Sequence, residues 1–380
     1  MTAVRVVVAA VAAVAATLVL AACESSATPV TPPAGGGGAG GGSGSAVATV
    51  TGDAHTAYTK LCTPCHAADL RGGAADHAPS LISQTFLESA SDSFLTRAIA
   101  YGRPGTSMAA YSSALGGPLD DAAVRSLVSF IRSSGGVQPK DLQNPGPGDV
   151  TRGAAVYHKS CIVCHGDTVA RGEAVHLANA KFLDSASDSF IKYAIVNGRP
   201  GTKMIAWAST LSDQDIDDVV AYVRNFAGKV QPEQKLLPPP TGSEPLVINP
   251  GGKQPDFKLK DDRFVGVDQV KAALDAKQRV IIIDARPPSE WRQVHVAGAV
   301  SIPYHDMKRL DDIANDGTWI VSYCACPHHL SGIVTDELRK RGYKHAVVLD
   351  EGINEWHRRG YPVVAAEGVK PPPKENPPPK

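Results

Sequence analysis

The sequence contains two copies of one module, and this internal repeat constrains the fold more than any other feature of the chain. Three motifs recur in the same order, and the second copy is slightly shorter between the first motif and the last. The paired segments are Cys62–His66 and Cys161–His165, Ser89–Phe94 and Ser185–Phe190, and Gly102–Met108 and Gly198–Met204. Because each copy is long enough to form a small domain, we expect two tandem domains of similar structure.

Each copy opens with Cys-x-x-Cys-His, which is the attachment signature of c-type haem. Two thiols at this spacing can bond the two vinyl groups of one porphyrin, and the adjacent histidine then faces the iron. A zinc site and a redox-active Cys-x-x-Cys are the alternatives, but neither requires that histidine. The sequence therefore predicts two covalently bound c-type haems. The predicted attachment cysteines and proximal histidines are Cys62, Cys65 and His66 in the first copy, and Cys161, Cys164 and His165 in the second.

Methionine is the predicted sixth ligand of each iron. Met108 and Met204 occupy the same place in both copies, directly after a Gly-Arg-Pro-Gly-Thr turn and one further residue. An isolated methionine is more often a core residue, but its recurrence after the same turn favours ligation, and a thioether raises the reduction potential relative to two histidines. Four histidines are weaker candidates, because none recurs at an equivalent position: His55, His77, His158 and His176.

The helix patterns of both copies agree with a small helical domain. Predicted helices lead into each haem motif, and others that begin at an N-cap residue close each module. These helices are Asp53–Leu61, Thr151–Ser160, Asp120–Ser133 and Ser212–Phe226. The aromatic residues expected where the first and last helices cross are Tyr58, Phe130, Tyr157 and Tyr222.

Each module resembles the class I c-type cytochromes, over residues 52–135 and 151–228. The resemblance implies an all-α fold around one haem and a role in electron transfer. Members of this family often hold the proximal imidazole with a proline carbonyl. Pro79 is placed for that role in the first copy, whereas Val175 takes the position in the second. We therefore expect the packing and the potential of the second haem to differ.

Beyond a Pro/Gly-rich linker at 231–254, the periodicity of the sequence changes. Short β-branched runs alternate with helical patterns, which is typical of a doubly wound α/β domain with a parallel sheet. The predicted strands are Val280–Ile283, Ala299–Ile302, Trp319–Tyr323 and Ala346–Leu349. The predicted helices are Val267–Ala276, Asp306–Ala314, Ser331–Arg341 and Ile353–Arg359. In such sheets the active loop leaves the carboxyl end of a strand.

The C-terminal domain resembles the rhodanese family of sulfurtransferases over residues 260–365. The resemblance rests on Ile283–Arg286, Glu290–Trp291, His295–Ala299, Val321–Cys324, Gly342–Tyr343, Leu349–Ile353, Trp356 and Gly360–Pro362. It implies that Cys324 is the nucleophile that receives a sulfane sulfur as a persulfide, whereas Asp284 and Arg286 are expected to form a structural ion pair. The loop then departs from the family, because Pro327 withdraws an amide donor and no arginine follows the cysteine. Thiosulfate is therefore not the expected donor.

Three interpretations of this loop remain open. As an active thiol, Cys324 attacks at the N-terminus of the next helix, which favours its thiolate, and Cys326 resolves the persulfide. His328 or His329 would then supply charge or a proton. As a metal site, the same cysteines and histidines are four soft or borderline ligands. As a binding module, the rhodanese fold is inactive. Perturbed cysteines on such loops are more often functional, which favours the active thiol.

A short apolar run after Arg5 ends in Leu-Ala-Ala-Cys at residues 20–23, which resembles a bacterial lipoprotein signal. It implies cleavage before Cys23 and lipidation of its thiol; a plain signal peptide and an uncleaved anchor helix are the alternatives. The Ser-, Pro- and Gly-rich segment that follows predicts a flexible tether. The sequence therefore predicts an exported, membrane-anchored lipoprotein that faces the periplasm or the cell exterior.

The predicted organisation has eight parts. They are a lipoprotein signal peptide (1–22), a tether (23–51), a first cytochrome c domain (52–135), a linker (136–150), a second cytochrome c domain (151–228), a linker (229–259), a rhodanese-like domain (260–365) and a disordered Pro-rich tail (366–380). Hydrophobic residues make up 43% of the chain, enough for packed cores. A net charge of zero disfavours a nucleic-acid partner, and the lack of further apolar runs excludes a polytopic membrane protein.

The combined prediction is a membrane-tethered dihaem c-type cytochrome whose electron transfer is coupled to thiol or sulfane-sulfur chemistry at Cys324. Its expected partners are a redox protein, a sulfur-containing small molecule or thiol, and a membrane through the lipid anchor. The main alternative is an electron-carrier lipoprotein whose rhodanese-like domain only docks a partner. Another is a sulfurtransferase that uses its haems as redox sensors. Turnover that requires Cys324 separates the first two.

Overall fold

The computed structural model describes residues 53–73, 78–229, 235–325, 328–372 and 374–375. The predicted signal peptide, the lipidation site Cys23, the tether, His77 and Cys326 lie outside these residues. Within the described ranges, no helix is both long enough and apolar enough to cross a membrane.

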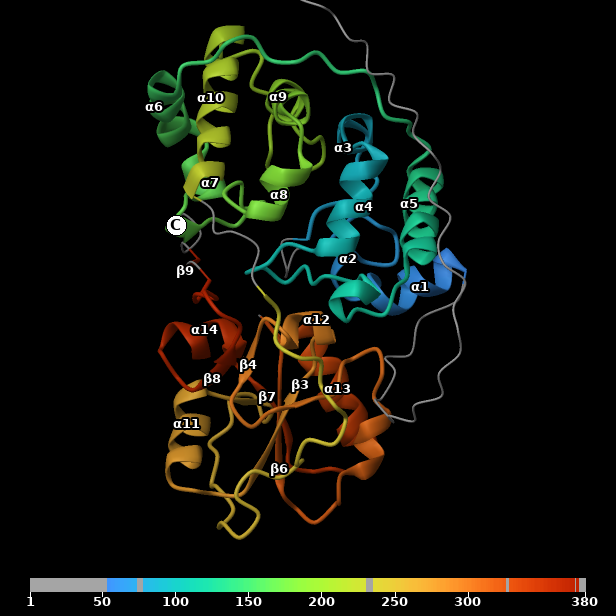
Figure 1. The fold of residues 1–380 in the computed structure, drawn as a ribbon, viewed down its shortest axis with the longest axis vertical. Helices are drawn as coiled ribbons and strands as arrows, with labels where there is room; N and C mark the ends of the chain where they lie inside the picture. The colour runs from blue at the N-terminus through green and yellow to red at the C-terminus, as the bar shows by residue number, and fades with distance from the viewer. Residues whose placement is uncertain (1–52, 74–77, 230–234, 326–327, 373, 376–380) are drawn as a thin grey trace, which may run out of the picture. The chain divides into compact units, whose positions relative to one another are not determined.

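Two helical modules follow each other along the chain (Figure 1). The first comprises α1 (Ala54–Leu61), α2 (Thr63–His66), α3 (Gln84–Ser89), α4 (Asp92–Tyr101), the 3₁₀ turn η1 (Ser113–Leu115) and α5 (Asp121–Gly135). The second comprises α6 (Val150–Ser160), α7 (Ile162–His165), the short strand β1 (Ala170–Arg171), α8 (Ala180–Ser185), α9 (Asp188–Asn197), α10 (Asp213–Asn225) and the 3₁₀ turn η2 (Ala227–Lys229). The five α-helices of one module thus recur in the other.

Side-chain caps set where these helices begin. Asp53 accepts a hydrogen bond from the first turn of α1, and Ser212 and Asp215 form a capping box at the start of α10. Ser91 and Ser187 cap α4 and α9 in the same way, which explains why serine recurs in the second repeated motif. The predicted starts of α1 and α10 are confirmed by these caps.

The first and last helices of each module cross through aromatic side chains, as expected. Tyr58 on α1 lies 5.3 Å from Phe130 on α5, and Tyr157 on α6 lies 5.2 Å from Tyr222 on α10, measured between ring centroids. Each first-helix tyrosine is buried and donates a hydrogen bond, at 2.7 Å, to the carbonyl of the residue after the motif histidine. The crossing therefore also fixes the chain that leaves each Cys-x-x-Cys-His motif.

A five-stranded parallel sheet forms the core of the C-terminal domain, with strand order β2-β7-β6-β3-β5. All residues of β3 and β7 are buried, as expected for a sheet covered on both faces. The strands are β2 (Phe264–Val265), β3 (Val280–Asp284), β5 (Val300–Ser301), β6 (Trp319–Tyr323) and β7 (Ala346–Leu349). The helices are α11 (Val267–Asp275), α12 (Pro288–Trp291), α13 (His329–Lys340) and α14 (Gly352–Arg358). The predicted doubly wound α/β fold is confirmed.

Some local features differ from the expectations. The helix predicted at 306–314 is a 3₁₀ turn, η3 (Lys308–Asp312), in which only Leu310 is buried, so no apolar stripe supports a longer helix. Outside the main sheet, β4 (Val294–Val296) pairs antiparallel with β8 (Val363–Ala365), a pair too short to show a period in the sequence. Within the tail predicted to be disordered, β9 (Lys374–Glu375) pairs in parallel with β1.

The two helical modules contact each other through residues that the repeat duplicates. The guanidinium of Arg103 lies 3.3 Å from Ser185 Oγ, and that of Arg199 lies 3.2 Å from Ser89 Oγ. The arginine of each Gly-Arg-Pro-Gly turn therefore reaches the serine of the other module. Reciprocal contacts of this kind arise when two similar surfaces pair about a two-fold axis.

Aromatic rings fill the centre of this interface. Phe94 and Phe190, which are equivalent in the two copies, stack with their centroids 4.7 Å apart and their planes 23° from parallel. Arg103 lies 5.4 Å from the centroid of Phe94, and Arg199 lies 5.3 Å from that of Phe190. Burial lowers the pKa of both arginines to about 10, so both carry charge at neutral pH. The interface thus combines apolar stacking with two half-buried cations.

Replacing Phe190 with alanine removes one ring of this stack and should lower the free energy of unfolding by about 3–5 kcal/mol. Thermal unfolding of the holoprotein measures the loss as a lower midpoint. Val169→Ala is the control, because this side chain is 76% exposed and its truncation should change the midpoint little. Equal shifts in the two variants would contradict a central role for the stack.

Candidate functional site

Backbone carbonyls orient the histidine of each Cys-x-x-Cys-His motif. Nδ1 of His66 lies 3.1 Å from the carbonyl oxygen of Pro79, and Nδ1 of His165 lies 2.8 Å from that of Val175. A carbonyl only accepts, so Nδ1–H donates in both modules and the Nε2 lone pair is left for a metal. Burial lowers the pKa of both imidazoles, which favours the neutral form that ligates.

Val175 takes the role that the cytochrome family usually assigns to proline. The contact is made by a main-chain carbonyl, which every residue carries, so the side chain at this position does not decide it. At this contact the two modules differ only in the side chain of the residue that supplies the carbonyl. That side chain is 40% exposed at Val175.

The predicted methionine ligands lie on loops of the same form. Gly102 and Gly198 end α4 and α9 with φ of +61° and +62°, where an added Cβ would meet the backbone of the returning loop at 2.4 and 2.5 Å. The N–H of the following arginine donates to the carbonyl of Met108 in the first loop and of Met204 in the second, at 2.7 Å in both. Glycine is therefore required where each loop begins.

The histidines that compete for the sixth position have other contacts. The ring of His55 packs on an aromatic ring of α5, that of His158 packs on one of α10, and Nε2 of His176 is 2.8 Å from the carbonyl of Asp167. Each module thus carries two cysteines, one oriented histidine and one methionine on a closed loop. This donor set fits a c-type haem, with thiols for covalent attachment and imidazole and thioether for the iron.

Cys324 directly follows the central strand β6, where the sequence predicts a nucleophile. Its side chain is buried, and Sγ lies 3.2 Å from the hydroxyl oxygen of Ser331 in the first turn of α13. The N–H of Ile353 donates to the Cys324 carbonyl at 3.0 Å. The thiol therefore lies at the N-terminus of a 12-residue helix, whose partial positive charge favours an anion.

The other predicted residues of this loop have different surroundings. Nε2 of His328 lies 2.9 Å from a carboxylate oxygen of Asp350, and its ring packs on Phe264 with centroids 4.2 Å apart. His329 lines the same pocket as Cys324. Among the residues that the structure describes, which exclude Cys326, no three His, Cys, Asp or Glu side chains are grouped to hold a metal ion.

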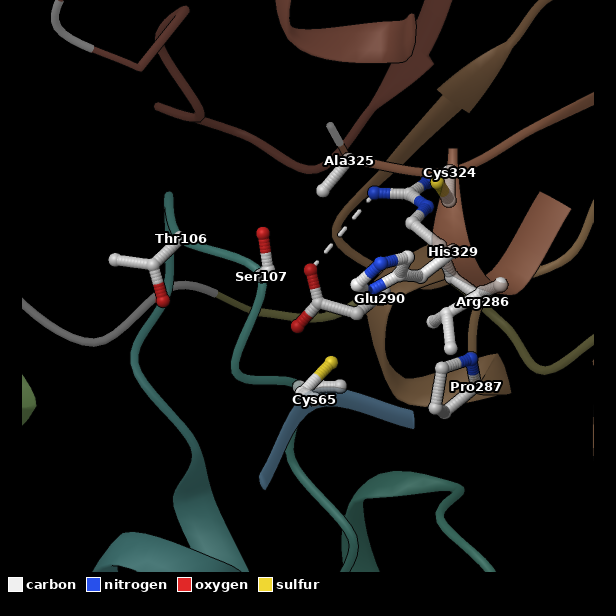
Figure 2. Close-up of a pocket in the computed structure, with 11 residues that line it drawn as sticks. Cys65, Thr106, Ser107, Arg286, Pro287, Glu290, Cys324, Ala325 and His329 are labelled. Atoms are coloured by element: carbon white, nitrogen blue, oxygen red, sulfur yellow. Dashed lines mark ion pairs between the residues drawn. The ribbon is translucent and has the colours of Figure 1, made fainter. Parts of the chain in front are cut away.

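A buried ion-pair network lies beside Cys324. Asp284 pairs with Arg286 at 2.7 Å, as predicted for a structural pair, and accepts a hydrogen bond from the Tyr323 hydroxyl at 2.8 Å. Arg286 also lies 3.8 Å from the carboxylate of Glu290 (Figure 2). Burial raises the pKa of Glu290 to about 7. The guanidinium is thus occupied by two carboxylates of its own domain.

One pocket is lined by both the first helical module and the C-terminal domain (Figure 2). The lining residues are Cys65, Thr106, Ser107 and Ala109 from the module, and Arg286, Pro287, Glu290, Cys324, Ala325, His329 and Leu330 from the domain. The pocket thus places the predicted nucleophile and a predicted haem-attachment cysteine on the walls of one space, which encloses about 10 Å³.

Comparison with known families identifies two parts of the chain. Residues 148–223 match the family model for cytochrome C oxidase, cbb3-type, subunit III, and residues 266–359 match the model for the rhodanese-like domain. The chain contains a cytochrome c domain and a rhodanese-like domain. The cytochrome c domain implies covalently bound haem and a function in electron transfer.

Curated relatives fall into the same two groups. The cbb3-type cytochrome c oxidase subunit CcoP of Azospirillum sp. (strain B510) is 27% identical over 189 residues, which cover 45% of this chain and 60% of that protein. The FixP subunit of Bradyrhizobium sp. (strain ORS 278) is 26% identical over 182 residues, with 46% and 60% covered. A sulfurtransferase of Allochromatium vinosum is 31% identical over 97 residues, 23% of this chain and 82% of that protein. The chain therefore spans less than two thirds of either oxidase subunit.

The rhodanese-like domain covers the face of the first module that follows the methionine loop. The equivalent position in the second module, the cytochrome c domain of residues 148–223, is exposed. Ala109 and Tyr111, which follow the first-module methionine, are buried, and the Tyr111 hydroxyl lies 3.1 Å from that of Tyr304 in the rhodanese-like domain. Ile205, which is equivalent to Ala109, is 58% exposed. The same face thus has two different surroundings in the two modules.

Sequence reasoning missed the residues that join the domains. The Tyr304 hydroxyl donates to the carbonyl of Leu61 at 2.7 Å, and the Ser289 hydroxyl donates to a first-module carbonyl just after the methionine loop. No local pattern distinguishes this tyrosine or serine from others. Arg103 and Arg199 lie in one duplicated motif and the serines that they contact lie in another, so the repeat draws attention to these residues but does not show that they meet.

The pH dependence of the stability of a Glu290→Gln variant tests the electrostatics of the pocket that Cys65 and Cys324 line. Because the folded-state pKa lies above the ordinary value of 4.5, folding favours the protonated carboxyl and loses stability as pH rises from 4.5 through about 7. The melting temperature of the glutamine variant, relative to wild type, should therefore increase across this range. Glu337→Gln is the control, since the Arg341 hydrogen bond lowers the pKa of Glu337 and the relative stability should not increase there.

Proposed function

We propose that this chain is a dihaem c-type cytochrome whose electron transfer is coupled to sulfur chemistry at Cys324 of the rhodanese-like domain. The observation that carries the proposal is the pocket that Cys65 and Cys324 both line. Covalently bound haem supplies a one-electron acceptor, which a rhodanese fold does not contain.

The equivalent donor sets of the two modules support two haems. His66 and His165 are both oriented by a carbonyl at Nδ1, and Met108 and Met204 follow loops of the same form. The family model covers only the second module, so the first haem rests on the repeat and on this shared geometry.

Cys324 is the proposed nucleophile of the rhodanese-like domain. Its thiolate attacks the outer sulfur of a sulfane donor, the S–S bond of the donor breaks, and the donor leaves as a thiolate while Cys324 keeps a persulfide. This exchange needs no electron acceptor, but further oxidation of the bound sulfur does. Ser331 and the N-terminus of α13 support the anion. Cys326 is the proposed resolving thiol, and His328 or His329 the proposed source of charge.

A docking role for the rhodanese-like domain is the second candidate. It is favoured by the burial of Cys324, which is 3% exposed in a pocket that the first module covers. In that case the chain is an electron carrier, and Cys324 takes no part in turnover.

Export and anchoring through a lipid on Cys23 are also part of the proposal and rest on the signal in the sequence. The proposed redox partner meets the cytochrome c domain beside its haem motif, where Val163 is 55% and Ile205 58% exposed. These two side chains neighbour Cys164 and Met204 in sequence, so the exposed apolar surface adjoins residues proposed to hold the second haem. The similarity to oxidase subunits supports a partner in an electron-transfer chain.

Replacing Met108 and Met204 one at a time with alanine tests ligation and the number of haems. Each variant should lose one methionine-ligand absorption signature and lower one of two reduction potentials, because a thioether stabilises the reduced iron. Spectra and redox titrations of the purified holoprotein measure both. Unchanged spectra in both variants would contradict the assignment of Met108 and Met204 as iron ligands.

Cys324→Ser tests the coupling. The variant should no longer take up sulfur from a sulfane donor, and donor-dependent reduction of the haems should be lost. Intact-protein mass and haem absorbance measure the two effects. Reduction by ascorbate at the wild-type rate is the control that the haem sites are intact. A wild-type protein that takes up no sulfur from any donor, with an unaltered Cys324→Ser variant, would favour the docking role.

A further inference from the structure

The pocket at Cys324 suits a very small sulfur species. It encloses about 10 Å³, which is room for one water-sized group. Hydrogen bonds from Tyr304 and Ser289 to main-chain carbonyls of the first module join the two domains whose residues line this pocket. This space leaves more room beside Cys324 for hydrosulfide than for a bulky persulfide or a peptide thiol.

An adjoining pocket of about 50 Å³ offers a route for small anions. It shares Thr106, Arg286, Glu290 and Ala325 with the first pocket and is also lined by His357 and Lys370. Beyond it, the N-terminus of α13 presents partial positive charge at Cys324. A small anionic nucleophile thus has both a path and an electrostatic reason to approach the thiol.

We propose that hydrosulfide is the sulfur substrate, and that its oxidation to a persulfide on Cys324 sends electrons into the first helical module, on the wall that carries Cys65. This inference rests on the proposed function and names its substrate and its point of electron entry.

The step balances as a two-electron oxidation. Hydrosulfide and the Cys324 thiolate form one S–S bond, the S–H bond of hydrosulfide breaks, its proton goes to water, and two electrons leave. Two c-type haems, held by the donor sets of the two modules, would be the one-electron acceptors. A second hydrosulfide then attacks the outer sulfur and leaves as hydrogen disulfide, which restores the Cys324 thiolate without further oxidation. Two such haems would thus accept both electrons of one turnover.

Electrons enter through the first module because, of the two methionine loops, its loop is the one that lines the pocket. Thr106 and Ser107 face Cys324 across this space, whereas the equivalent Thr202 and Lys203 do not line either pocket. From the first module, the stacked rings of Phe94 and Phe190 continue the packed structure into the cytochrome c domain.

Anaerobic titration of the oxidised, full-length holoprotein with substoichiometric sodium sulfide tests the chemistry. We expect one sulfur atom to be added to Cys324 for each two irons reduced, read by intact-protein mass and haem absorbance. Cys324→Ser should add no sulfur and leave only slow, direct reduction by sulfide. If sulfide reduces the haems of the wild-type protein but the protein gains no sulfur in mass, the inference is overturned.

Matched substitutions at equivalent loop positions test the point of entry. Ser107→Trp fills the shared pocket, whereas Lys203→Trp places the same ring at a side chain that is 81% exposed. Ser107→Trp should slow both sulfide-dependent haem reduction and sulfur addition to Cys324 by at least about tenfold, and Lys203→Trp should stay within about twofold of wild type. Equal rates in the two variants would overturn entry through the first module.

Ala325→Leu narrows the same pocket from the rhodanese-like domain and leaves the methionine loop untouched. It should reproduce the slow reduction with both haem spectra intact, which separates blocked access from a damaged haem site. If a sulfane donor gives sulfur uptake and Cys324-dependent haem reduction while sulfide gives neither, this inference is overturned and the proposed function stands. Failure of Cys324→Ser to change either reaction would overturn both.

Discussion

A hydrogen bond from the hydroxyl of Tyr304 to the carbonyl oxygen of Leu61 ties the rhodanese-like domain to the segment that carries the first Cys-x-x-Cys-His motif. Leu61 directly precedes Cys62, and the hydroxyl of Tyr111 approaches the same carbonyl at 3.1 Å. Both tyrosine side chains are buried, so loss of the contact would leave a hydroxyl and a carbonyl group without a hydrogen-bond partner and out of reach of water. This contact joins the two domains whose residues line the shared pocket, and the proposed coupling of sulfur chemistry to haem rests on that pocket.

The repeat supplies two similar modules that the chain uses differently. Arg103 and Arg199 make equivalent contacts across the interface between the modules, so the two copies are symmetric there. The face after each methionine loop is not used symmetrically, because the rhodanese-like domain covers Ala109 while Ile205 is exposed. This asymmetry gives a direction to the proposed electron path, from the covered module to the one with an open face.

The departure of the rhodanese loop from its family pattern has a structural counterpart. The family loop supplies arginine and amides for an anionic donor, whereas this loop continues with Pro327 and histidines. The guanidinium that does line the pocket belongs to Arg286, and Asp284 and Glu290 already pair with it. A large dianionic donor therefore finds little uncompensated charge, while a small anion needs only the end of α13.

The sequence by itself determined the features that depend on neighbouring residues: the haem motifs, the capped helices, the buried strands and the place of Cys324 after β6. Spacing and periodicity along a few residues are enough to specify each of these. Only the tertiary structure decided which distant groups meet, as Tyr304 meets Leu61 and Cys324 shares a pocket with Cys65. Such contacts use main-chain carbonyls or the shape of a packed surface. Val175 shows the reason they escape the sequence, because its carbonyl orients His165 whatever side chain it carries.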